Sequence, residues 1–119
     1  QQGNHIGICH CTMCRRWGGG PFMTLEQCVA VTFSRPDYIS RYASSAWADR
    51  GFCKHCGTHL FYHLKENDHY VVPAGLFDTD EFALDIQIFT DEKPAFYDFA
   101  NQTKTMTGAE VFAAFSGKD

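Results

Sequence analysis

The sequence lacks a long hydrophobic run, and it lacks an excess of positive charge. In its 119 residues no apolar stretch approaches the roughly 18 residues that a membrane-spanning helix needs. The formal net charge is −4, whereas proteins that follow a nucleic-acid backbone usually present a basic face. No signal peptide is visible either. The sequence therefore disfavours membrane and nucleic-acid partners, and it predicts a cytoplasmic protein.

Internal repeats, linkers and low-complexity stretches are also absent from the sequence. Hydrophobic residues make up 45% and charged residues 20%, which is ordinary for a globular protein. A chain of this length suits one domain and hardly two. We therefore expect a single domain over residues 1–119.

Six cysteines are present, and their spacing is the most informative feature of the sequence. They form a C-x-C-x-x-C cluster, a C-x-x-C-G motif and one isolated residue, namely Cys9, Cys11 and Cys14, then Cys53 and Cys56 before Gly57, and Cys28. A disulfide framework is disfavoured, because the chain is long for a cysteine-stapled miniature and a C-x-C pair is hard to bridge. A thioredoxin-type redox pair is disfavoured because no βαβ pattern surrounds either cluster.

Zinc ligation explains this spacing better, since closely spaced thiolates converge readily on one tetrahedral ion. In a C-x-x-C-G turn, Gly57 permits the positive φ that brings two sulfurs together. Two arrangements fit the spacing equally well. Either three sulfurs of the first cluster leave an open, catalytic position, or Cys11, Cys14, Cys53 and Cys56 form one closed site without Cys9. We therefore expect one or two Zn²⁺ ions per chain.

The rest of the pattern predicts short strands and turns. Residues 15–21, with three glycines and a proline, predict a loop. Strands are predicted over residues 29–33, 38–43, 47–52, 60–64, 70–72 and 86–89. Thr107 and Glu110 form a capping box before an apolar stripe, which predicts one short C-terminal helix. The expected fold class is mainly β.

Four blocks of the sequence, in order, resemble the glutathione-dependent formaldehyde-activating enzymes, a family that also includes centromere-protein-V-like proteins. Residues 9–16 resemble its C-H-C-x-x-C-R segment, and residues 50–62 its G-F-C-x-x-C-G-T-x-L-x-Y segment. Residues 74–78 resemble its A-G-x-L-D turn, and residues 88–97 its closing strand and K-P-x-W segment, with Phe96 in place of Trp. The blocks span residues 8–100.

The resemblance implies an Mss4-like fold, in which β-sheets surround zinc. It implies that Cys9, Cys11 and Cys14 hold an active-site zinc, and that Cys53 and Cys56 belong to a separate structural zinc. In the family an upstream C-x-C pair completes the structural site, and nothing before Cys9 supplies that pair. Either those residues lie before Gln1, or the second site is incomplete. We therefore expect a domain without the family's N-terminal strands, whose uncovered sheet edge favours a homodimer.

The family activity implied is that of a carbon–sulfur lyase, which joins glutathione and formaldehyde as S-hydroxymethylglutathione; another thiol or small aldehyde is equally compatible with the sequence. Arg15 and Arg16 are candidates to grip a substrate carboxylate, and Trp17 is a candidate pocket residue. The plainer alternatives are solvated charges and a loop-anchoring tryptophan. His10 is expected to point away from the metal. The alternative function is a non-catalytic, zinc-stabilised binding module.

Overall fold

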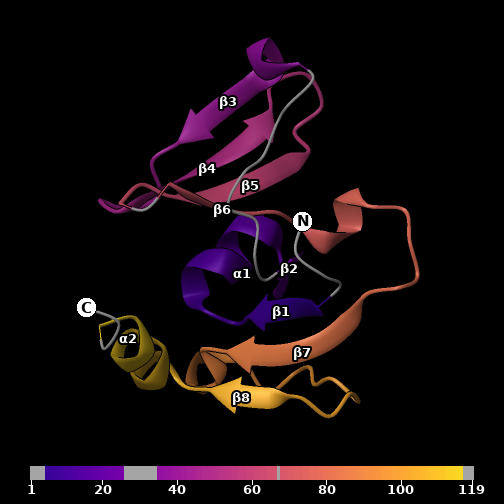
Figure 1. Ribbon diagram of the computed structural model, residues 1–119, viewed down its shortest axis with the longest axis vertical. Helices are drawn as coiled ribbons and strands as arrows, with labels where there is room; N and C mark the ends of the chain where they lie inside the picture. Colours follow the sequence, from indigo (N-terminus) through magenta and orange to yellow (C-terminus); the bar gives the residue numbers. More distant parts are fainter. Residues whose placement is uncertain (1–4, 26–34, 67, 117–119) are drawn as a thin grey trace. The chain divides into compact units, whose positions relative to one another are not determined.

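The computed structural model describes residues 5–25, 35–66 and 68–116. These residues divide into two compact units (Figure 1). The central unit holds the described residues of Thr24–Thr79, and the terminal unit holds those of His5–Met23 and Asp80–Asp119. Four-stranded sheets of order β2-β1-β7-β8 and β3-β4-β5-β6 account for the eight strands described. The mainly β prediction is therefore confirmed.

The sheet of the terminal unit joins both ends of the sequence. Its strands are β2 (Phe22–Leu25), β1 (His5–Cys9), β7 (Ala83–Ile88) and β8 (Lys104–Met106), of which β1, β7 and β8 run parallel. The division between the units falls within β2, whose last two residues belong to the central unit. Along β1 the side chains of Ile6 and Ile8 are buried, as the alternation of a strand requires. Cys9 therefore ends a strand that hydrophobic burial holds in register.

Helix α1 (Thr12–Gly18) replaces most of the loop predicted over residues 15–21, so that prediction was wrong. Cys11 caps the helix, with extended backbone angles and an Sγ that accepts a hydrogen bond from the Cys14 N–H. Gly19 ends it at φ 86°, and its N–H bonds the Arg15 carbonyl. Of the glycines that suggested a loop, Gly18 is thus the last residue of the helix and Gly19 is the residue that ends it.

The C-terminal helix α2 (Gly108–Ser116) begins as the capping box predicts. The Thr107 N–H donates to Glu110 at 2.8 Å, and the Glu110 N–H donates to the Thr107 hydroxyl at 3.2 Å. The described part of the chain therefore holds two α-helices where the sequence predicted one.

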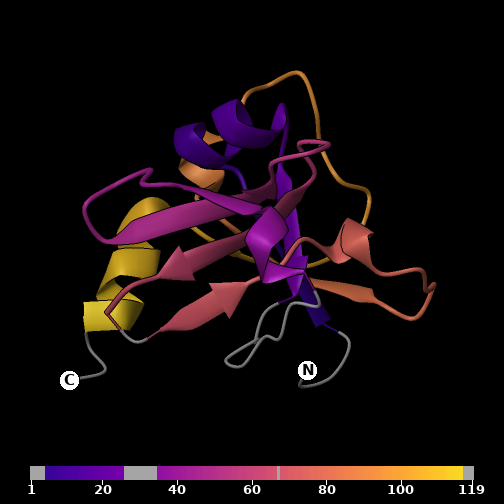
Figure 2. The same ribbon diagram turned by 90° about the horizontal axis from the view of Figure 1, so that it is seen from above.

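The sheet of the central unit is antiparallel throughout. It consists of β3 (Ile39–Tyr42), β4 (Ala48–Cys53), β5 (His59–Leu64) and β6 (His69–Val71), drawn side by side in Figures 1 and 2. Its core is built from Leu25, Ala48, Phe61, Val72 and Ala74. The turn between β4 and β5 carries the C-x-x-C-G motif, so two packed strands position it.

Three 3₁₀ turns, Pro36–Tyr38, Ala74–Leu76 and Thr90–Glu92, complete the elements described. The strands predicted over residues 38–43, 47–52, 60–64, 70–72 and 86–89 are confirmed as β3 to β7, with small shifts at their ends. The strand predicted over residues 29–33, like Cys28, lies outside the described residues. Among the helices described, none combines the length and apolarity needed to cross a membrane.

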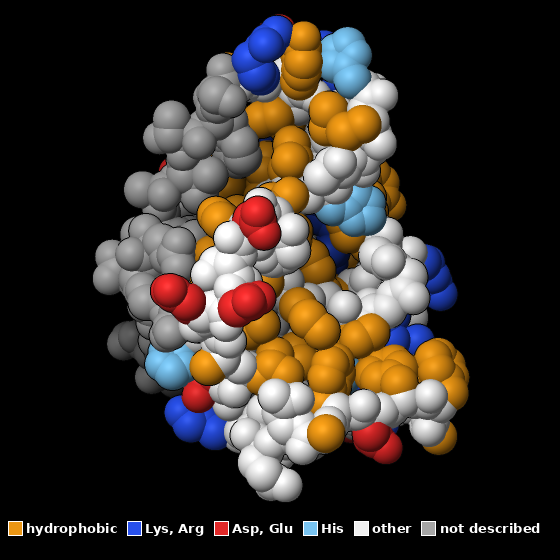
Figure 3. All heavy atoms as spheres, turned by 90° about the vertical axis from the view of Figure 1, so that its right-hand side faces the viewer, with side chains coloured by type: hydrophobic (Ala, Val, Ile, Leu, Met, Phe, Trp, Pro, Cys, Tyr) orange, Lys and Arg blue, Asp and Glu red, His pale blue; other side chains and the backbone are white. Residues whose placement is uncertain are grey.

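On the face shown in Figure 3, hydrophobic patches alternate with charges of both signs.

Candidate functional site

The thiols of Cys9, Cys11 and Cys14 form one cluster, with sulfur atoms within 4.8 Å of one another. Cys9 ends β1, Cys11 is the cap residue of α1, and Cys14 lies in the first turn of that helix. The strand end and the helix start therefore bring all three thiols together. Among the described residues this is the only group of three or more His, Cys, Asp or Glu side chains able to share an ion.

Hydrogen bonds within the cluster favour a thiolate at its centre. Bonds from Cys14 and Cys9 lower the pKa of Cys11 to about 2. The bond to Cys11, a second bond to Cys14 and burial together raise the pKa of Cys9. The Cys14 N–H also points at the Cys11 sulfur, at 3.4 Å. A soft cation such as Zn²⁺ suits this donor set, because thiolates are its preferred ligands and it would replace the shared protons.

His10, between two of these cysteines, turns its ring away from them. It is fully buried, with Nδ1 2.8 Å from the Tyr97 hydroxyl and Nε2 2.8 Å from Gln87 Oε1. Burial lowers the pKa of His10, and the positive charges of Lys93 and Arg15 act in the same direction. The expectation that His10 avoids the metal agrees with this arrangement. Its bonds to Gln87 and Tyr97 were not predicted.

Lys93 fixes the segment that carries Tyr97. Its Nζ donates to the carbonyl oxygens of Pro94 and Tyr97, at 3.1 and 2.6 Å, and pairs with Asp98 at 2.8 Å. The same ammonium lies 5.3 Å from the centre of the Tyr97 ring. Burial raises the pKa of Tyr97 and outweighs the positive charges of Arg15 and Lys93, which act in the opposite direction. Tyr97 therefore carries a protonated hydroxyl group on a segment that Lys93 fixes in place.

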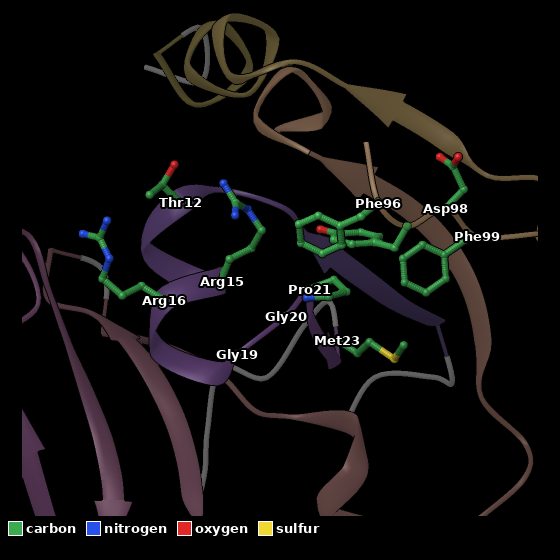
Figure 4. A pocket seen from close by; sticks show the side chains of 11 residues that line it. Thr12, Arg15, Arg16, Gly19, Gly20, Pro21, Met23, Phe96, Asp98 and Phe99 are labelled. Atoms are coloured by element: carbon green, nitrogen blue, oxygen red, sulfur yellow. The ribbon is translucent and has the colours of Figure 1, made fainter. Parts of the chain in front are cut away.

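A pocket of about 500 Å³ opens over this part of the terminal unit (Figure 4). Its lining combines α1, the glycine-rich segment after it and an aromatic segment, namely Thr12, Arg15, Arg16, Gly19, Gly20, Pro21, Met23, Phe96, Tyr97, Asp98 and Phe99. Helix α1 is thus capped by Cys11, contains Cys14 and forms part of the pocket wall.

The three candidate substrate residues differ in their positions. Arg15 and Arg16 line the pocket, whereas Trp17 is half-buried and is not part of the lining. Figure 4 shows the Arg15 side chain on the side of α1 that faces Phe96 and Phe99, and the Arg16 side chain on the opposite side of the helix. Arg15 is also anchored, because its Nε donates to the His10 carbonyl at 3.0 Å. Arg15 is therefore the better placed of the two cations to meet a ligand.

The C-x-x-C-G motif of the central unit forms the expected turn. Gly57 has φ 81°, and its N–H donates to the Cys53 carbonyl at 2.7 Å. The Cys56 sulfur lies 3.0 Å from the Thr58 hydroxyl, and this bond lowers the pKa of Cys56. In the part of the chain that the structure describes, Cys53 and Cys56 join no group of three or more candidate ligands. They form two of the four sulfurs that a closed thiolate site requires.

The chain is similar to known proteins over most of its length. Residues 2–92 match a family described as glutathione-dependent formaldehyde-activating enzyme. A Schizosaccharomyces pombe protein named as an uncharacterized lyase is 38% identical over 108 residues, which cover 89% of this chain and 79% of the relative. No solved structure matches the chain at a significant level.

Proposed function

Because the chain belongs to the glutathione-dependent formaldehyde-activating enzyme family, we propose that it is a zinc-dependent carbon–sulfur lyase-type enzyme. Its substrate would be the adduct of glutathione, or a similar small thiol, with formaldehyde or another small aldehyde. The observation that carries the proposal is the convergence of three thiols on one point, within the unit that holds the arginine-lined pocket. The lyase name of the fission-yeast relative supports the same reaction class.

Cys9, Cys11 and Cys14 would hold the Zn²⁺. When bound, the ion would lower the pKa of a thiol ligand and stabilise negative charge on an aldehyde oxygen. The protein contributes the shape of this site through the end of β1 and the start of α1. The Cys14 N–H, 3.4 Å from the Cys11 sulfur, adds a fixed positive dipole beside the thiolate.

The pocket residues suit a peptide-like thiol that carries carboxylates. Arg15, held at its Nε by the His10 carbonyl, presents the rest of its guanidinium as a paired donor for a carboxylate. Arg16 adds a second positive charge at the pocket wall. The rings of Phe96 and Phe99 supply apolar surface for the aliphatic part of the ligand.

The reaction needs no oxidant or reductant. In the synthetic direction the thiol sulfur attacks the aldehyde carbon, a carbon–sulfur bond forms, and the carbonyl oxygen takes up the proton that the thiol gave up. In the lyase direction the same bond breaks and the proton returns to sulfur. The enzyme contributes by holding both reactants together in the productive geometry.

Exchange NMR with ¹³C-formaldehyde and glutathione tests the proposal, because it measures adduct formation and cleavage at equilibrium against the uncatalysed background. We expect the wild-type protein to accelerate exchange, and Cys11→Ser to lose both the acceleration and one zinc ion by elemental analysis. Cys28→Ser, the same chemical change at a cysteine outside both motifs, serves as the control. Full zinc content and full exchange in Cys11→Ser would refute the assignment.

The same measurement distinguishes the proposed enzyme from the alternative, a non-catalytic, zinc-stabilised binding module. A wild-type protein that holds zinc and binds glutathione without accelerating exchange would be a binding module. One closed zinc site that uses Cys53 and Cys56, with no thiol binding, would lead to the same conclusion.

A further inference from the structure

A directional chain of hydrogen bonds runs from the sheet of the terminal unit to the pocket. It links Thr103, Gln87, His10 and Tyr97 through contacts of 3.0, 2.8 and 2.8 Å. His10 in the middle is fully buried, and Tyr97 at the end lines the pocket. Such a chain can carry its protons in either of two opposite directions, and a group at one end decides which direction holds.

The start of the chain fixes its direction. The Thr103 hydroxyl donates to the Lys104 carbonyl, at 2.9 Å, and a carbonyl can only accept. The Gln87 amide nitrogen therefore donates to Thr103, which leaves Gln87 Oε1 facing His10 Nε2. Nε2 must then carry the ring proton. Nδ1 is left as an acceptor, so the Tyr97 hydroxyl donates to it.

This direction determines what Tyr97 can offer to a ligand. Its one proton is committed to His10, so the remaining capacity of its oxygen is to accept. Lys93 holds the backbone through the Tyr97 carbonyl, and the Tyr97 ring stacks on the buried His10 ring with 5.5 Å between centroids, so the hydroxyl cannot easily turn away. The pocket therefore contains a positioned acceptor that needs a hydroxyl or amino donor on the ligand.

We propose that Tyr97 is a specificity-determining residue, whose hydroxyl oxygen accepts a hydrogen bond from the hydroxyl group of an S-(hydroxymethyl) thiol adduct. His10 and Gln87 are its positioning residues. This inference rests on the proposed function for the identity of the ligand. The free thiol and an S-alkyl thioether lack the hydroxyl donor that distinguishes the adduct. The site thus favours the adduct over the glutathione that remains after cleavage.

The first arm of the test examines the chain itself and needs no substrate. Long-range ¹H–¹⁵N NMR on the full, zinc-containing protein reports which ring nitrogen of His10 carries the proton. We expect the Nε2–H tautomer in the wild type, and a shift of the Nδ1 signal toward that of an unbonded nitrogen in Tyr97→Phe. In Gln87→Met we expect the two tautomers to mix. An Nδ1–H tautomer in the wild type would overturn the proposal, whatever the enzyme does.

The second arm compares two ligands that differ in one hydroxyl. In Tyr97→Phe we expect kcat/KM for S-hydroxymethylglutathione cleavage to fall about tenfold, as the loss of one sequestered hydrogen bond predicts. We expect the inhibition constant of S-methylglutathione, which lacks the hydroxyl, to change less than about twofold. Tyr42→Phe removes the same group from an exposed tyrosine outside the pocket lining, and should alter neither value.

The outcomes are distinct. Equal losses for both ligands would mean that Tyr97 contributes to the shape of the pocket and does not recognise the hydroxyl group. Unchanged values would mean that Tyr97 does not contact the ligand. Either result overturns the proposal. A wild-type protein that neither cleaves the adduct nor binds S-methylglutathione overturns the proposed function, and with it the ligand named here. The tautomer measurement still separates that failure from an error in the direction of the chain.

Discussion

At the scale of single residues, the two adjacent arginines of α1 carry the same charge, but one hydrogen bond gives them different capacities to bind a ligand. Arg15 is half-buried, and the His10 carbonyl holds its Nε, whereas Arg16 is exposed. An anchored guanidinium loses less side-chain entropy when a ligand binds it, so more of the interaction appears as affinity. The electrostatic contribution of an exposed cation is largely screened by solvent.

We therefore expect Arg15→Ala to raise KM for the glutathione adduct by about 10- to 100-fold, with a smaller change in kcat, since a charge-assisted hydrogen bond contributes about 1.5–3 kcal/mol. Arg15→Lys should recover part of the loss, because it keeps the charge and loses the paired donors. Arg16→Ala is the matched control, with a change in KM below about threefold. Initial rates over a range of adduct concentrations measure all three, and equal effects at both positions would contradict the assignment.

At the scale of elements, the sequence predicted the three-cysteine cluster but not helix α1, which Cys11 caps and which contains Cys14. The C-x-C-x-x-C spacing of Cys9, Cys11 and Cys14 is local and therefore visible in the sequence, whereas their assignment to one open site came from the family resemblance. Helix α1 was missed because it is short, a cysteine caps it, and its last residue begins a glycine run. The glycine run predicts a loop, whereas in the structure Gly19 has a left-handed backbone and ends the helix.

The pairing of β4 with β5 depends on a glycine whose role the sequence pattern does not reveal. Gly51 lies opposite Phe61, and a Cβ at Gly51 would overlap the ring of this buried phenylalanine. We expect Gly51→Ala to lower the free energy of unfolding by about 1–3 kcal/mol, the usual cost of overpacking a core. Urea denaturation followed by circular dichroism measures the loss.

Gly75→Ala is the control for this prediction, because a Cβ there meets nothing within 4 Å in the same unit. Its change should lie within about 0.5 kcal/mol, as for most surface substitutions. Losses of the same size at both glycines would show that the Phe61 contact is not the cause.

At the scale of the whole molecule, long-range contacts decide what the sequence could not predict. The bonds of His10 to Gln87 and Tyr97 join positions 77 and 87 residues apart, across a parallel pairing of β1 with β7. Alternating apolar residues predict that a strand exists, but not its partner or register. The fold class and the three-cysteine cluster were therefore within reach of sequence reasoning, while the pocket and its hydrogen-bonded chain were not.

The division into two units makes a prediction about metal removal. An ion bound only by the folded cluster stabilises it by RT ln(1 + [Zn]/Kd), about 2.7 kcal/mol at a free zinc concentration of 100 Kd. The cluster lies in the terminal unit, so its amides should gain most of this stabilisation. At that concentration the amides of β1 and α1 should exchange with solvent up to about 100-fold more slowly in the wild type than in Cys11→Ser.

Hydrogen-exchange mass spectrometry at fixed free zinc measures this difference segment by segment. Strands β4 and β5 of the central unit are the internal control, because Cys11→Ser leaves Cys53, Cys56 and the core around Phe61 unchanged. We expect their exchange rates to be the same in both proteins. An equal change in both units would mean that they unfold together, so that the zinc free energy is shared by the whole chain. No change in either unit would mean that Cys11 does not hold the ion, and the proposed active site would then have to be abandoned.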